Sequence, residues 1–129
     1  MKKIILILTL IAPVVGFGQC IVGDCENGEG TYLWEDGSIC NGSWKNGNLH
    51  GSGVQIVYDE GVFIGVYDGG FNEGTISGWG TETLYDDDGL LLGTYVGNWA
   101  DDNYNGWGIW IWDDGTIEKG IYKDGNLIP

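Results

Sequence analysis

Glycine pairs recur along this chain of 129 residues at nearly regular intervals. The pattern Gly-x-Gly begins at Gly28, Gly51, Gly78 and Gly106, so successive pairs are 23, 27 and 28 residues apart. Each pair leads through a short apolar or aromatic segment into an acidic turn that ends in glycine: EDG at 35–37, DEG at 59–61, DDDG at 86–89 and DDG at 113–115. Self-similarity with a period of about 20 to 50 residues is typical of repeat architectures. The chain is therefore predicted to be an array of similar units.

The segments between the acidic turns alternate like β-strands. In IWIW at 109–112 the isoleucines face one way and the tryptophans the other, and VQIVY, TETLY and TYLW have similar length and content. Turn dipeptides that favour positive φ angles lie between such segments. They are Asp36-Gly37, Asn46-Gly47, Asp114-Gly115 and Asp124-Gly125. The sequence thus predicts an all-β fold, an elongated array of antiparallel β-hairpin repeats with about four units that stack on one another.

A glycine with bulky neighbours follows each acidic turn. The elements are CNGSW at 40–44, FIGVY at 63–67, YVGNW at 95–99 and EKGIY at 118–122. Their central glycines stand where a side chain would block the approach of backbone or of an aromatic ring; they are Gly42, Gly65, Gly97 and Gly120. Tyr95 and Trp99, on either side of Gly97, are expected to point to the same face of the sheet.

These elements resemble the MORN (membrane occupation and recognition nexus) repeat, which reads approximately Tyr-x-Gly-x-Trp-x-x-Gly-x-x-x-Gly-x-Gly before a short strand and an Asp-Gly turn. CNGSWKNGNLHGSG fits with Cys40 in place of the tyrosine, and YVGNWADDNYNGWG fits with Asp102 in place of the middle glycine. FIGVYDGGFNEGTISGWG fits with a four-residue insertion before Gly78. The resemblance covers about residues 26–128 and implies a scaffold or interaction module, with phospholipid binding proposed for some family members.

Residues 1–18 have the features of a secretory signal peptide. A basic MKK start precedes the apolar run IILILTLIAPVV, and the small residues Gly16 and Gly18 precede Gln19 at the positions that signal peptidases prefer. The run is shorter than the roughly 20 residues of a membrane span. We therefore expect a signal peptide at 1–18, a repeat domain at 19–129, and a secreted, periplasmic or cell-surface protein. Acylation of Cys20, as in a lipoprotein, is disfavoured because Gln19 is not a small residue.

The charge restricts the partners. The chain has five lysines, no arginine and a formal net charge of −14, which excludes nucleic acid as a partner because its binding depends on clustered basic side chains. The chain without residues 1–18 contains three lysines and nineteen acidic residues, so its formal net charge is 3 − 19 = −16. Anionic membranes are disfavoured for the same reason.

The three cysteines form an odd set. Export permits disulfides, and Cys20 with Cys25 is the local pair that would leave Cys40 free. If Cys20 were acylated, Cys25 and Cys40 would instead be the two cysteines left to form a disulfide. No zinc-type spacing is present, so neither a metal nor another cofactor is expected.

The acidic residues favour turns over catalysis. Asp113 with Asp114, or the run Asp86 to Asp88, could in principle form a carboxylate pair, but aspartate in a hairpin turn bonds to nearby backbone amides. His50 has no sequence neighbours that suggest a triad. The chain is therefore expected to be non-enzymatic, without catalytic residues.

The aromatic residues divide into two groups. Tyr32, Trp34, Trp110 and Trp112 follow their Gly-x-Gly pairs by two and four residues and are expected to form core columns. Trp79 and Trp107 each lie between two glycines, which leaves their rings uncovered, and they are the candidate binding residues. We expect an exported structural or protein-interaction module. The alternative is a surface module that binds polysaccharide or lipid through the aromatic face.

Overall fold

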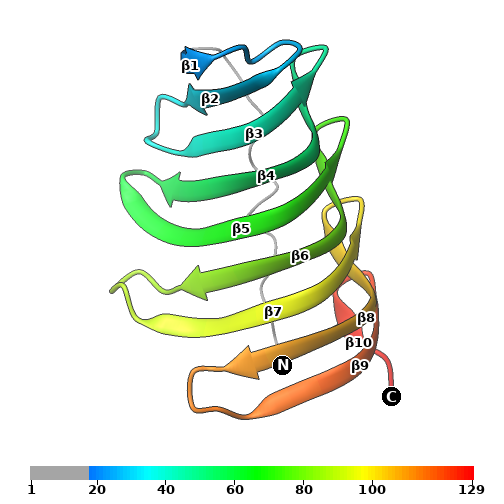
Figure 1. Ribbon diagram of the computed structural model, residues 1–129. Helices are drawn as coiled ribbons and strands as arrows, with labels where there is room; N and C mark the ends of the chain where they lie inside the picture. Colours follow the sequence, from blue (N-terminus) through cyan, green and yellow to red (C-terminus); the bar gives the residue numbers. More distant parts are fainter. Residues whose placement is uncertain (1–17) are drawn as a thin grey trace.

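The computed structural model describes residues 18–129, and the predicted signal peptide lies outside the described residues apart from Gly18. Ten strands form one sheet in sequence order, and every neighbouring pair is antiparallel (Figure 1). The strands are β1 Gln19–Gly23, β2 Glu29–Leu33, β3 Ile39–Lys45, β4 Asn48–Asp59, β5 Val62–Asn72, β6 Thr75–Tyr85, β7 Leu91–Ala100, β8 Asn103–Trp112, β9 Ile117–Lys123 and β10 Asn126–Leu127. The predicted all-β array of hairpins is confirmed. The described part contains no helix long and apolar enough to cross a membrane.

The hairpins close with two kinds of turn. Asn46-Gly47 and Asp124-Gly125 have positive φ at both residues, as predicted for tight two-residue turns. At Asp36-Gly37 and Asp114-Gly115 only the glycine has positive φ, so the prediction of the same tight turn is wrong there. These loops are wider, and the aspartate side chain accepts a backbone hydrogen bond from Ser38 or Thr116 at 2.9 and 2.8 Å.

One row of glycines crosses the sheet from β1 to β9. Each glycine in this row lies opposite the next across a strand pair: Gly23, Gly30, Gly42, Gly53, Gly69, Gly80, Gly97, Gly108 and Gly120. The pairing register shifts directly beyond the row in β3–β4, β5–β6 and β7–β8, where the strands bend. The regular glycine spacing therefore places the bends of β3 to β8 at the same level.

The position of Gly65 corrects the predicted alignment of the third unit. Gly65 pairs with Val57 and Leu84, outside the row, whereas Gly69 occupies the row between Tyr67 and Phe71. The unit therefore begins at Tyr67 and reads YDGGFNEGTISGWG, with the same spacing as YVGNWADDNYNGWG. No four-residue insertion is present. The predicted start at Phe63 is wrong because FIGVY also places a glycine between bulky residues, and the two alternatives differ only in strand register.

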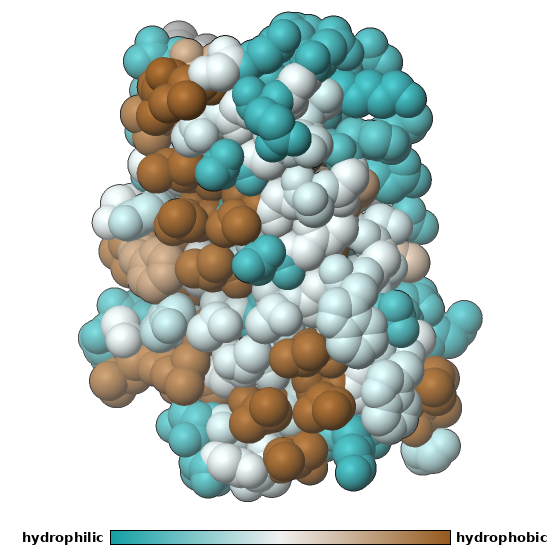
Figure 2. Space-filling model, in the orientation of Figure 1, coloured by the Kyte–Doolittle hydropathy of each residue, from teal (hydrophilic) through white to brown (hydrophobic). Residues whose placement is uncertain are grey.

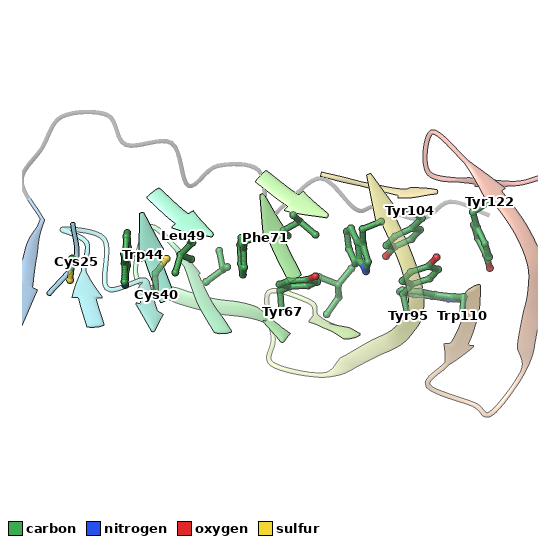
Figure 3. Close-up of a cluster of buried hydrophobic side chains, with 14 residues drawn as sticks. Cys25, Cys40, Trp44, Leu49, Tyr67, Phe71, Tyr95, Tyr104, Trp110 and Tyr122 are labelled. Carbon is green, nitrogen blue, oxygen red and sulfur yellow. The ribbon is translucent and has the colours of Figure 1, made fainter. Parts of the chain in front are cut away.

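The core is a chain of aromatic side chains on the inner face of the bent sheet (Figure 3). Tyr95 and Trp99 are both buried and meet edge to face at 5.4 Å between ring centroids, which confirms that they share a face. Tyr95 also stacks on Tyr104 at 3.8 Å. Of the predicted core columns, Trp110 is buried, and Tyr32, Trp34 and Trp112 are partly buried against the core. The Tyr67 ring of the third unit also lies 5.1 Å from the Trp99 ring of the next unit, so contacts between rings join successive units.

Candidate interaction surface

Trp79 and Trp107 occupy equivalent positions on the outer face of neighbouring units. Trp79 in β6 is 55 % exposed and Trp107 in β8 is 45 % exposed. Asn98 of β7 lies between them: it pairs with Trp79, and its side-chain amide donates to the Trp107 carbonyl at 3.5 Å. Both rings are uncovered, as expected from their glycine neighbours, and the two tryptophans are about 10 Å apart because they are separated by two strand spacings.

Isoleucines extend this surface across β8 and β9. Trp107 pairs with Ile121 and Ile111 pairs with Ile117, so the register places these side chains on one face. Figure 2 shows hydrophobic side chains gathered over β7, β8 and β9. The outer patch consists of Trp79, Trp107, Ile109, Ile111, Ile117 and Ile121. Alternation in IWIW indicated that Ile109 and Ile111 face away from the core, but only the register shows that β9 adds two more isoleucines.

The turn aspartates bond to the backbone of their own turns. The side chain of Asp86 accepts hydrogen bonds from the amides of Asp88 and Leu90, and that of Asp114 accepts one from Thr116. The hydrogen bonds to Thr116 hold the pKa of the Asp114 carboxyl below its usual value. His50 is used structurally, because its Nδ1 accepts a hydrogen bond from the Glu73 amide. Within residues 18–129 no group of His, Cys, Asp and Glu side chains is arranged to hold a metal ion.

A buried carboxyl group that sequence reasoning missed lies in the core. Glu82 is fully buried between Tyr67 and Tyr95 of the neighbouring strands, and Tyr104 donates a hydrogen bond to its Oε1 at 2.5 Å. Among the described residues, Oε2 of Glu82 has no hydrogen-bond partner. Burial raises the pKa of Glu82 to about 8, although the Tyr104 hydrogen bond acts in the opposite direction. The carboxyl group is closed off from solvent.

The cysteines pair as the sequence suggested. Cys20 forms a disulfide with Cys25, and Cys40 is a free, buried thiol. Burial raises the pKa of the Cys40 thiol to about 11, with the Trp34 indole acting against this shift. Cys40 occupies the core position that Tyr67 and Tyr95 occupy in the other units. Its raised pKa and its burial make it a packing residue and not a reactive thiol.

Comparison with protein families agrees with this geometry. The MORN repeat family matches residues 26–39, 40–56 and 95–117. No curated protein is similar enough to be counted as a match. The matched segments contain Gly30, Gly42 and Gly97 of the glycine row and the aromatic residues that pack beside it. This chain is a MORN-repeat protein.

Proposed function

We propose that the protein is a non-enzymatic, exported interaction module that binds another protein through the outer patch. The observation that carries this proposal is the set of exposed aromatic and branched side chains on one face of a continuous sheet, with Trp79, Trp107 and Ile121 each about half exposed. Exposed tryptophans grouped with apolar residues are typical of binding surfaces. Because the rings project from strands and not from loops, little ordering accompanies binding.

The double variant Trp79→Ala/Trp107→Ala is expected to abolish capture of envelope proteins by the mature chain, at unchanged thermal stability. The control Val62→Ala/Leu90→Ala removes exposed apolar side chains outside the patch and should leave capture unchanged. The measurement is quantitative mass spectrometry of proteins retained by each variant. Equal retention by both variants would contradict the assignment. A change of tryptophan emission with a polysaccharide, lost in the tryptophan variant, would favour the carbohydrate alternative.

Export is supported by the Cys20–Cys25 disulfide, because such bonds persist in oxidising compartments. The disulfide also occupies the sulfur that lipoprotein acylation would modify. We expect the protein isolated from its producing cell to begin at Gln19 and to contain one disulfide, with Cys40 as a thiol. Intact-mass and peptide mass spectrometry check both points. Recovery of an acylated Cys20 or of the uncleaved chain would contradict this prediction.

Binding to anionic membranes is not part of the proposal. Lys119 and Lys123 lie in β9, whereas Lys45 lies in β3, six strands away in the sheet order. These three lysines therefore do not form the compact basic cluster that attraction to anionic headgroups requires.

A further inference from the structure

A cavity of about 290 Å³ lies at the β1–β3 end of the array, away from the outer patch. Three aromatic residues, Tyr32, Trp34 and Trp44, contribute to its walls, together with the Cys20–Cys25 disulfide, Glu26 and Gly47. The Tyr32 ring lies 4.5 Å from the ring of Trp34 and 6.1 Å from that of Trp44, measured between centroids. Figure 3 shows Cys25 and Trp44 beside each other at this end of the core.

The loop that carries Glu26 is held in place by its own hydrogen bonds. The side chain of Asp24 accepts from the amides of Glu26 and Asn27 at 2.9 and 3.0 Å, and these bonds lower the pKa of its carboxyl, that from Asn27 most. The Cys20–Cys25 disulfide ties the same loop to β1. The loop is therefore fixed before any ligand arrives, which reduces the entropic cost of binding.

Three further bonds join this loop to the β3–β4 hairpin. The Gly47 amide donates to the Glu26 carbonyl at 3.1 Å, the Asn46 amide to the Asn27 side chain at 3.0 Å, and the Trp44 amide to the Gly28 carbonyl at 2.8 Å. The Trp44 indole is fixed as well, since it donates to the Gly30 carbonyl at 2.9 Å. The aromatic and acidic walls of the cavity thus have a defined geometry.

The walls combine three aromatic rings with one carboxylate. The Glu26 side chain is exposed, and no lysine is among the described residues that line the cavity. Aromatic rings attract cations through their quadrupoles, most strongly when the cation is an alkylated ammonium that loses little hydration. The net charge of −14 raises the local concentration of cations near the protein.

We propose that this cavity binds a small organic ammonium cation, with Tyr32, Trp34 and Trp44 contacting its alkyl groups and Glu26 balancing its charge. Among the described lining residues, an inorganic cation would find one carboxylate and no second charged ligand. A neutral sugar would lack the charge that Glu26 and the rings complement. The site is independent of the outer patch, because its lining residues come from β1, β2, β3 and the adjoining loops.

Choline is the probe, and its uncharged carbon isostere 3,3-dimethylbutan-1-ol is the matched ligand control. By titration calorimetry at 0.15 M salt, we expect saturable binding of choline with one site per chain, and binding of the isostere to be weaker by about tenfold or more. A peptide that carries trimethyllysine is titrated in the same way. Its affinity compared with that of choline distinguishes a free cation from one carried by a protein side chain. Equal affinity for choline and its isostere, or no binding of either cationic probe, would overturn the proposal.

Two substitutions test the assigned walls. Glu26→Gln should weaken choline binding by about threefold or more without changing thermal stability, because within residues 18–129 the hydrogen bonds of Glu26 are made by its backbone and not by its side chain. Trp34→Leu should weaken binding by about tenfold or more. Glu60→Gln, in the distant β4–β5 turn, should leave binding unchanged, as should Trp79→Ala/Trp107→Ala. If Glu60→Gln weakens binding as much as Glu26→Gln, the attraction is a general effect of the acidic chain and the site is wrong.

Discussion

The free energy of unfolding is expected to fall as the pH rises from about 4.5 to about 8, and to become nearly independent of Glu82 above that range. The pKa of the Glu82 carboxyl is raised by burial from the ordinary 4.5 to about 8 in the folded protein. Between these values the folded state holds a proton that the unfolded state has released. Unfolding therefore releases a proton, and stability decreases as the pH rises, by on the order of 5 kcal/mol across the full range.

Glu82→Gln should remove most of this pH dependence. The amide is nearly the same size as the protonated carboxyl and keeps an oxygen to accept from the Tyr104 hydroxyl. We therefore expect the variant to have about the stability of the wild type at pH 4.5 and to be more stable by several kcal/mol at pH 8.5, where the wild type carries a buried charge. Urea denaturation across pH, followed by tryptophan fluorescence, measures both slopes.

Repulsion among the many acidic residues also lowers the free energy of unfolding as the pH rises. This contribution needs a separate control. That repulsion acts between exposed side chains and is screened by salt, whereas the burial of Glu82 is not. Glu35→Gln removes an exposed acid and should leave the slope almost unchanged. Parallel curves for the wild type and Glu82→Gln in 0.5 M salt would show that the folded protein does not hold a neutral Glu82.

Gly97→Val should strongly destabilise the folded protein. A Cβ atom at this position would lie 2.5 Å from the Gly108 Cα and from the Trp107 carbonyl oxygen, and 2.8 Å from the Tyr95 hydroxyl oxygen. Two of these atoms belong to the backbone of the paired strand, so they cannot move aside without opening the β7–β8 ladder. We expect a loss of about 3 kcal/mol or more in the free energy of unfolding.

Two controls separate this steric effect from other properties of the position. Gly89→Asn replaces a turn glycine whose φ is 82°, a conformation that asparagine tolerates. No atom of the described residues lies within 4 Å of the added Cβ. Asp101→Ala changes an exposed turn residue of the same unit. Both should cost less than about 1 kcal/mol in urea denaturation. If Gly97→Val costs no more than these controls, the glycine row is not required by close packing.

The sequence by itself determined the type of architecture. Recurring Gly-x-Gly pairs, acidic turns and alternating strands are local patterns, and a unit that repeats them has one way to bury its aromatic side chains, which is to stack on its neighbours. The buried positions of Tyr95, Trp99 and Trp110 and the exposed positions of Trp79 and Trp107 followed from the same patterns. The local Cys20–Cys25 pair could also be predicted, because the two cysteines are only five positions apart in the sequence.

The tertiary structure decided what depends on the pairing register. Phe63 and Tyr67 are both bulky residues near glycines, and only the row through Gly69 and Gly80 shows that the third unit begins at Tyr67. A buried Glu82 could not be predicted, since a carboxylate in a strand usually faces solvent. The cavity beside Glu26 was equally hidden, because residues from separate strands and loops form it. Periodicity specifies which residues share a face, whereas contacts between units depend on how the bent strands are aligned.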